Sequence, residues 1–225
     1  SGTVKEIIRG DRRKILEIVI EPNSSNKKIS HKVEKIDSLS PEKIKNFLLK
    51  TGSWPFIRQR PFNLLADPDI IPKSIHISAI SSVPLGVDYD FILKNNREDF
   101  QSGINILNTL LPGKVNLFID KDFQGFFSKI KNANIFHVSG PHPSGNVSVQ
   151  IQKTNPINFG EKVWVIRPED IVNIAILFST GIYSCKRTLA ISGSPVANPQ
   201  YFKTIIGSDL SPILKKLNID STIQN

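Results

Sequence analysis

The run VNLFI at residues 115–119 is apolar at all but one position, and the runs SIHISAI (74–80) and VWVI (163–166) lie on either side of it in the chain. Runs of this kind are typical of strands that are buried on both faces of a parallel sheet. A further strand is predicted at residues 135–138. The four runs therefore indicate an α/β sheet rather than an all-helical or all-β fold.

Amphipathic helices are predicted between these strands. Apolar residues recur at helical spacing over 100–111 and again over 168–180, and residues 123–130 form a shorter helix. Another helix begins after Ser40, where serine, proline and glutamate follow one another as N-cap, first helical residue and first-turn acid. This alternation of strands and helices predicts a Rossmann-like α/β domain over residues 30–186.

Two smaller units flank the α/β domain. Residues 1–29 contain two β-branched runs around Gly10, which predicts a hairpin. A hairpin alone is marginally stable, so we expect it to pack on the α/β domain or to be mobile. Residues 187–225 show a strand-strand-helix order and form a separate unit.

Composition restricts the function classes. The chain has 225 residues, 39% of them hydrophobic and 22% charged, and no apolar run of the roughly 20 residues that a membrane span needs. The formal net charge is +9, and residues 1–60, with 14 basic and 7 acidic residues, carry +7 of it. Nucleic acid, anionic lipid and an acidic partner are each compatible with this charge. Because acids are mixed with the lysines and no nucleic-acid-binding motif accompanies them, a solvated surface is favoured and no nucleic-acid partner is predicted.

The sequence offers little visible catalytic chemistry. It contains neither a G-x-G-x-x-G nor a P-loop motif, and the prolines of GPHPSG (140–145) remove N–H groups that a phosphate loop would use. His137 and His142 lack nearby cysteine or carboxylate ligands, and Cys185 lacks an identified base. No catalytic, cofactor-binding or metal-binding residue is predicted. A chain of this length without methionine is expected to be a piece of a longer protein.

Several motifs together resemble one family. The stretches SGTVKEIIRGDRRKILEIVIE (1–21), WPFIRQRPF (54–62), GPHPSG (140–145), LFSTG (177–181) and SGSPV (192–196) are similar, in this order, to segments of the NqrA component of the Na+-translocating NADH:quinone oxidoreductases. The resemblance covers essentially the whole chain. It implies a truncated fragment of a peripheral subunit, on the cytoplasmic side of the bacterial inner membrane.

The resemblance also implies partners and cofactors. The partners are the other subunits of a six-subunit complex, chiefly its membrane subunits, which passes electrons from NADH to ubiquinone and exports Na+. The complex carries FAD, FMN, riboflavin and an iron–sulfur centre on other subunits, so no cofactor is expected in this chain. Residues 1–29 are then a remnant of a barrel-sandwich domain, and residues 187–225 are the start of a β-grasp, SLBB-like domain.

The α/β domain is, by the same resemblance, a degenerate relative of the flavin-binding subunit of respiratory complex I and of the RnfC component of Rnf-type complexes. Where those relatives have a glycine-rich loop, this sequence has residues 52–62, GSWPFIRQRPF, which we interpret as a loop. Bulky rings there would occupy the space of a phosphate. A residual FMN or NADH site, as in the Rnf-type relative, is the alternative hypothesis.

The candidate site of this chain is a quinone or partner surface. Aromatic faces can stack on a quinone ring, and arginines can donate to its carbonyls or pair with an acidic partner. The alternative interpretation is that Trp54 and Phe62 only fill the vacant flavin space. The candidate residues are Trp54, Phe56, Arg58, Arg60, Phe62 and His142.

Overall fold

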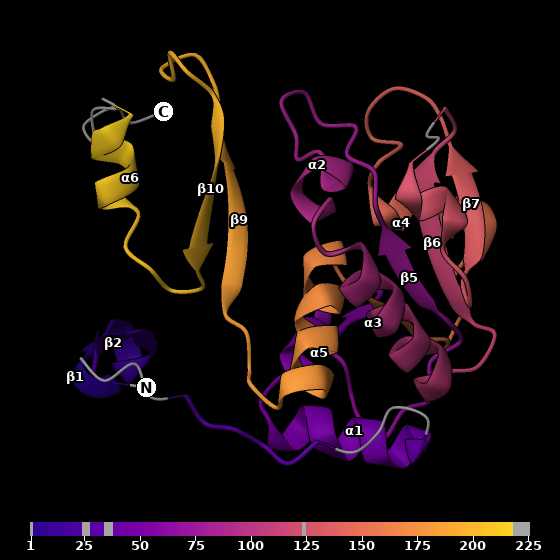
Figure 1. Ribbon diagram of the computed structural model, residues 1–225, viewed down its shortest axis with the longest axis horizontal. Helices are drawn as coiled ribbons and strands as arrows, with labels where there is room; N and C mark the ends of the chain where they lie inside the picture. The colour runs from indigo at the N-terminus through magenta and orange to yellow at the C-terminus, as the bar shows by residue number, and fades with distance from the viewer. Residues whose placement is uncertain (1, 24–27, 34–37, 123–124, 218–225) are drawn as a thin grey trace.

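A six-stranded mixed sheet forms the centre of the structure, a computed structural model that describes residues 2–23, 28–33, 38–122 and 125–217 (Figure 1). The strand order is β4-β3-β8-β5-β6-β7, and the middle pairs β8-β5, β5-β6 and β6-β7 are parallel. The strands are β3 (Arg58–Arg60), β4 (Leu64–Leu65), β5 (Ile75–Ser78), β6 (Val115–Asp120), β7 (Asn134–Val138) and β8 (Val163–Val165). The four predicted strands are confirmed as β5, β6, β7 and β8.

The chain changes direction across the sheet after β7. From β5 it proceeds outward to β6 and then β7, and it returns to place β8 on the opposite side of β5. His76 of β5 therefore lies between Asn116 of β6 and Val165 of β8. The carboxyl ends of β5 and β8 meet where the strand order reverses, which is where open α/β sheets commonly bind ligands.

The loop predicted for residues 52–62 is wrong in its second half, because Arg58–Arg60 form strand β3. This strand pairs antiparallel with both β8 and β4. Its neighbouring prolines do not interrupt the ladder: Pro55 lies in a 3-10 turn, η3 (Trp54–Phe56), and Pro61 follows the last residue of the strand. Pairing with β8 and β4 thus makes this segment a strand although its local sequence is polar.

Helices cover the sheet unequally. Three helices pack against one face of the sheet and form the hydrophobic core with it: α1 (Pro41–Lys50), α3 (Arg97–Leu110) and α5 (Pro168–Thr180). Helix α4 (Val147–Thr154) packs near β5. Gly103 lets α3 approach α5, since a Cβ there would lie 2.5 Å from the Ile171 carbonyl oxygen. The described chain also contains helices α2 (Tyr89–Leu93) and α6 (Ser211–Lys216) and the 3-10 turns η1 (Asp11–Arg13) and η4 (Phe126–Lys129).

The predicted helix ends are largely confirmed. Ser40 caps α1, its Oγ accepting from the Lys43 amide at 3.3 Å. Gly181 ends α5 with a φ of +71°, a conformation that costs glycine little. The helix predicted at 123–130 is a 3-10 turn over 126–129, and its first two residues, 123 and 124, lie outside the described part of the chain.

The amino-terminal hairpin does not pack on the α/β body. Its strands, β1 (Gly2–Arg9) and β2 (Ile15–Pro22), pair antiparallel as predicted, but the hairpin lies apart from the sheet (Figure 1). Val4 pairs with Ile20 and is 54% exposed, and the pair Ile7 and Ile18 is similarly open. Of the two alternatives expected for this hairpin, packing on the α/β domain is therefore wrong, and mobility stays a prediction. A strongly apolar ladder remains exposed.

The carboxyl-terminal unit is a second hairpin followed by a helix. Strands β9 (Lys186–Ile191) and β10 (Gln200–Ile205) pair antiparallel, and α6 follows, as the strand-strand-helix order predicts. The hairpin contacts the body through Tyr201, whose hydroxyl accepts from the Asp88 amide at 2.9 Å and whose ring stacks on Phe91. In the described residues no helix is long and apolar enough to cross a bilayer.

Candidate functional site

Trp54 and Phe56, two of the predicted surface residues, lie inside the core. They are 5% and 9% exposed. The Trp54 Nε1 donates to the Ala66 carbonyl at 2.7 Å, and its ring meets Trp164 edge to face at 5.4 Å between centroids. The Phe56 ring stacks on Tyr183 at 5.6 Å. These side chains fill space and offer little area to a partner.

Arg58 and Arg60 lie on β3, the strand next to the edge strand β4, and Phe62 lies in the turn between these two strands. The two arginines are two residues apart on β3, so they share one face. Arg58 donates to the Asn63 carbonyl, while burial and the charge of Arg58 lower the pKa of Arg60. Phe62 is 75% exposed, with the Lys162 ammonium 5.9 Å from its ring centroid. We call these three residues, together with Lys162, the edge patch; no acidic residue of the described chain forms an ion pair with it.

His142 belongs to a cavity of about 320 Å³ at the carboxyl ends of β5 and β8, which we call the switch-point cavity. Its wall contains serines from the turn after β5, the GPHPSG loop, and the segment that joins β8 to α5. The lining side chains that bear on its chemistry are Ser78, Ser81, Ser82, Tyr89, His142 and Arg167. No aspartate or glutamate lines this cavity among the residues described.

Ser82 fixes the shape of the switch-point cavity. Its Oγ accepts from the Gly145 amide at 2.8 Å and lies 3.2 Å from the His142 Nδ1. Gly145 is required at this contact, because a Cβ would lie 2.4 Å from the Ser82 nitrogen. Ser78 adds a bond from its hydroxyl to the Gly145 carbonyl at 3.2 Å. The two loops are thus fastened together, and the imidazole is held at the rim.

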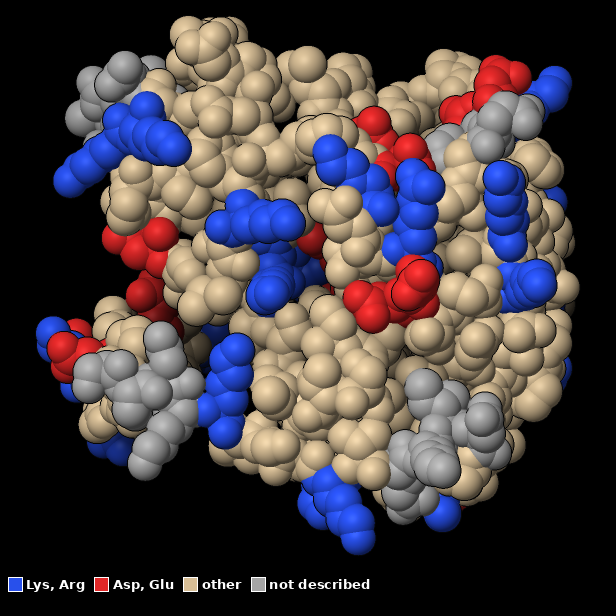
Figure 2. Space-filling view, in the orientation of Figure 1, with Lys and Arg blue, Asp and Glu red and all other residues tan. Residues whose placement is uncertain are grey.

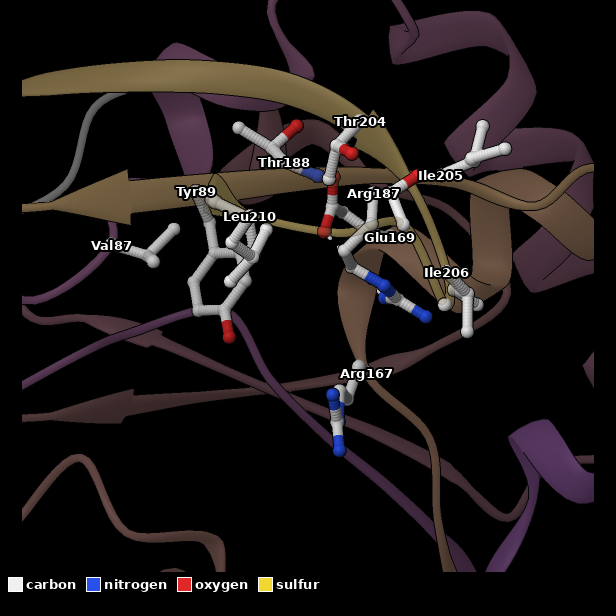
Figure 3. Close-up of a pocket in the computed structure, with 13 residues that line it drawn as sticks. Val87, Tyr89, Arg167, Glu169, Arg187, Thr188, Thr204, Ile205, Ile206 and Leu210 are labelled. Atoms are coloured by element: carbon white, nitrogen blue, oxygen red, sulfur yellow. Dashed lines mark hydrogen bonds and ion pairs between the residues drawn. The ribbon is translucent and has the colours of Figure 1, made fainter. Parts of the chain in front are cut away.

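A second cavity, of about 480 Å³, lies between the start of α5 and the β9–β10 hairpin (Figure 3), and we call it the hairpin cavity. Its wall is largely apolar, with Val87, Leu189 and Ile206 among its members. Tyr89 and Arg167 line both cavities. Burial raises the pKa of Tyr89, so its hydroxyl stays protonated and can donate a hydrogen bond.

Arg187 anchors the β9–β10 hairpin to α5. Its Nη2 lies 2.6 Å from the Asp170 Oδ1, and its Nη1 lies 3.5 Å from the Glu169 Oε2. Glu169 also accepts from the Thr188 amide at 3.0 Å. Burial raises the pKa of Asp170, and Arg187 acts in the opposite direction. Both carboxylates are therefore compensated by Arg187, whereas Arg167 forms no ion pair with any residue that the structure describes.

The described residues do not provide a set of ligands for a metal ion. In the described ranges no group of three or more histidine, cysteine, aspartate or glutamate side chains could hold a metal ion. His76 is fully buried in β5, where its Nε2 lies 2.7 Å from the Ser74 Oγ. Burial, with the charge of Lys73, lowers the pKa of His76 to about 4. His76 thus belongs to the core.

Tyr89, Ser82 and Arg167 are absent from the sequence-based candidates. Ser82 is the second residue after the apolar run 74–80, and Arg167 follows directly on the run 163–166. In a parallel sheet, residues after such runs gather at one edge. This position was the available signal, but it identifies the cavity only once the order of the strands is known.

Comparisons with known proteins give a consistent family. Residues 39–183 match the family described as the NqrA second alpha/beta domain. The chain is similar to the A component of the Na(+)-translocating NADH-quinone reductase of Actinobacillus pleuropneumoniae serotype 5b (strain L20), with 32% identity over 95% of this chain and 49% of the relative. The corresponding protein of Haemophilus influenzae (strain PittGG) is 31% identical over 95% of this chain and 48% of the relative. The chain spans about half the length of the curated relatives it matches.

Proposed function

This chain belongs to the NqrA family, and from that premise we propose that it acts as the NqrA component of a Na+-translocating NADH:ubiquinone reductase. In this proposal the protein is a peripheral subunit, on the cytoplasmic side of the bacterial inner membrane. It belongs to the complex that couples electron transfer from NADH to ubiquinone with Na+ export, and the isolated fragment is inactive. It is structural and associated with the quinone rather than cofactor-bearing. Its partners are the other subunits, chiefly the membrane subunits.

The observation that carries the structural role is the burial of Trp54 and Phe56. Flavin-binding relatives are expected to have a glycine-rich loop where this chain has residues 52–62. Here the Trp54 indole is hydrogen-bonded and packed edge to face on Trp164, and Phe56 stacks on Tyr183. Rings held in this way leave the backbone no free approach to a phosphate. The parallel order β7-β6-β5-β8 supports the Rossmann-like assignment of residues 30–186.

The flanking units fit the same proposal. Residues 1–29 supply a hairpin whose apolar ladder is exposed, as expected for a remnant of a barrel-sandwich domain. Residues 187–225 supply the strand-strand-helix order with which a β-grasp, SLBB-like domain would begin. Figure 2 shows basic and acidic side chains intermingled on one face of the molecule, which supports a protein partner over nucleic acid.

We place the partner contact on the edge patch. It combines an exposed ring with arginines that form no ion pair with the acids of the described residues, the combination that docks an acidic, partly apolar surface. The test is capture of the remaining complex by the tagged chain. The double variant Arg58→Gln, Arg60→Gln should reduce capture at least fivefold. Lys50→Gln, at the far end of α1, is the control and should leave capture unchanged. Equal capture by all three proteins would refute this placement.

A residual FMN or NADH site is the alternative function. It predicts absorbance near 450 nm in the purified protein, or FMN detected in that protein by mass spectrometry. We expect neither. A separate titration with a soluble ubiquinone analogue tests the quinone association, because both tryptophans lie close together and would report binding near β3 by fluorescence quenching. Absence of saturable quenching would remove the quinone role for this chain.

A further inference from the structure

We propose that the switch-point cavity binds a small oxyanion, with a phosphate group as the ligand class, and that Arg167 is its principal contact. This inference goes beyond the role in the complex and stands independently of it. It depends on the charge of the cavity, on the free guanidinium, on the neutral donors around it, and on where the cavity lies in the sheet.

The charge of the cavity favours an anion. Its lining holds one guanidinium, one imidazole and several hydroxyls, and none of its residues is acidic. A concave site with charge of one sign and partly apolar walls concentrates the opposite charge. Here the apolar part comes from residues such as Ile80 and Val165. A cation would meet Arg167 without a compensating carboxylate.

Arg167 is available for a ligand. It occupies the N-cap position of α5, where a guanidinium, which has donors but no acceptor, cannot cap the helix amides. Across the described chain its guanidinium forms no ion pair, whereas the nearby Arg187 is held by Glu169 and Asp170. A guanidinium presents parallel N–H donors that match two oxygens of one phosphate or carboxylate group.

Neutral donors complete the site. Tyr89 keeps its proton, and Figure 3 shows its hydroxyl and the Arg167 side chain directed to the same side, away from the β9–β10 hairpin. Ser82 engages the Nδ1 of His142 at 3.2 Å, so the ring is positioned while its Nε2 forms no hydrogen bond within the described structure. A phosphate group accepts from hydroxyl, imidazole and guanidinium donors together.

The position and size agree with a ligand site. The cavity lies outside the carboxyl ends of β5 and β8, where the strand order reverses. Its volume of about 320 Å³ is at the small end of the range of ligand pockets. This size suits a phosphate group carried alone or on a small ester.

The experiment is a titration of the full chain with inorganic phosphate at constant ionic strength, followed by the backbone amide NMR signals of Ser82, Gly145 and Val147. Saturable shifts are expected for wild type. Arg167→Gln should weaken binding at least tenfold, and Arg167→Lys should recover part of the loss. Arg97→Gln, which removes an equal charge at the start of α3, is the matched control and should change affinity less than twofold.

Two further arms distinguish the sources of phosphate. Adenosine monophosphate that displaces inorganic phosphate at the same signals assigns the site to a phosphate ester, and failure to displace it assigns the site to free phosphate; either result supports the proposal. The proposal is overturned if neither compound produces a saturable shift, or if Arg97→Gln weakens binding as much as Arg167→Gln. If Arg167→Gln does not fold, Arg167→Lys replaces it in the test. The proposal is then overturned if Arg167→Lys binds phosphate as tightly as wild type.

Discussion

Protonation of His76 should destabilise the fold as the pH falls. Its ring is fully buried and stacked on Phe118 at 5.7 Å between centroids, and its Nδ1 has no hydrogen-bond partner among the described residues. Burial, with the charge of Lys73, lowers the pKa of His76 from 6.5 to about 4. The folded state thus favours the neutral ring. Between those two pH values the unfolded chain binds more protons, so stability is present above pH 6.5 and is lost as the pH falls towards 4.

The magnitude follows from the same two values. A tenfold difference in proton affinity is worth about 1.4 kcal/mol, so the full effect of His76 is about 3 kcal/mol of unfolding free energy. Urea unfolding, followed by the fluorescence of the two buried tryptophans, measures it at about pH 7 and about pH 4. Carboxylates also titrate in this range, so the quantity of interest is the difference in slope between wild type and His76→Gln.

Two controls isolate His76. The triple variant His31→Asn, His137→Asn, His142→Asn removes every other histidine of the chain and should keep the wild-type pH slope. NMR titration of the single histidine left in that variant should give a midpoint far below 6.5. A midpoint near 6.5, or a pH slope that His76→Gln leaves unchanged, would refute the reasoning.

Three further predictions concern stability. Arg187→Gln leaves Asp170 buried without its cation and should cost about 3 kcal/mol in urea unfolding at about pH 7, with a smaller loss at low pH where Asp170 takes up a proton. Gly181→Ala and Gly113→Ala both place alanine at a φ of +71°, but of the two new Cβ atoms only the one at Gly181 would clash, lying 2.1 Å from the His31 carbonyl oxygen. Gly181→Ala should therefore lower the thermal midpoint clearly more than Gly113→Ala. Equal midpoints would contradict the clash. Trp54→Phe leaves the buried Ala66 carbonyl without its donor and should lower the free energy of unfolding by about 2 kcal/mol in the same urea assay. A loss below about 0.5 kcal/mol would contradict the role of this hydrogen bond.

The elements that were predicted are those whose signal is local. Residues 115–119 form a strand because nearly every side chain there must be buried, and the cap at Ser40 depends on its own hydroxyl and the next three residues. Strand β3 was missed because its polar residues owe their conformation to pairing with β8 and β4. Helix α4 was missed because its first turn carries two valines, although Asn146, its N-cap, was a readable start signal.

The candidate site was harder to predict than the fold. Trp54, Phe56 and Arg58 stand close together in one motif, yet the structure buries the first two and leaves the third half-buried on β3. Sequence spacing does not reveal this division, since it depends on the 3-10 turn that rotates the chain before β3. Arg167 likewise has no motif of its own, and only the reversal of strand order brings it beside His142.

The start of α5 explains why one arginine is paired and its neighbour is free. Glu169 and Asp170 stand in the first turn, where acidic side chains are favoured by the helix dipole. Without Arg187 these carboxylates would be the nearest counter-ions for Arg167, and the cavity next to it would lose its positive character. Arg187, supplied from the β9–β10 hairpin, takes both. The hairpin therefore affects the switch-point cavity although Arg187 does not line it. Arg187 forms the ion pairs with the two acids, whereas Arg167 acts on Asp170 only through its charge, which lowers the pKa of that carboxyl.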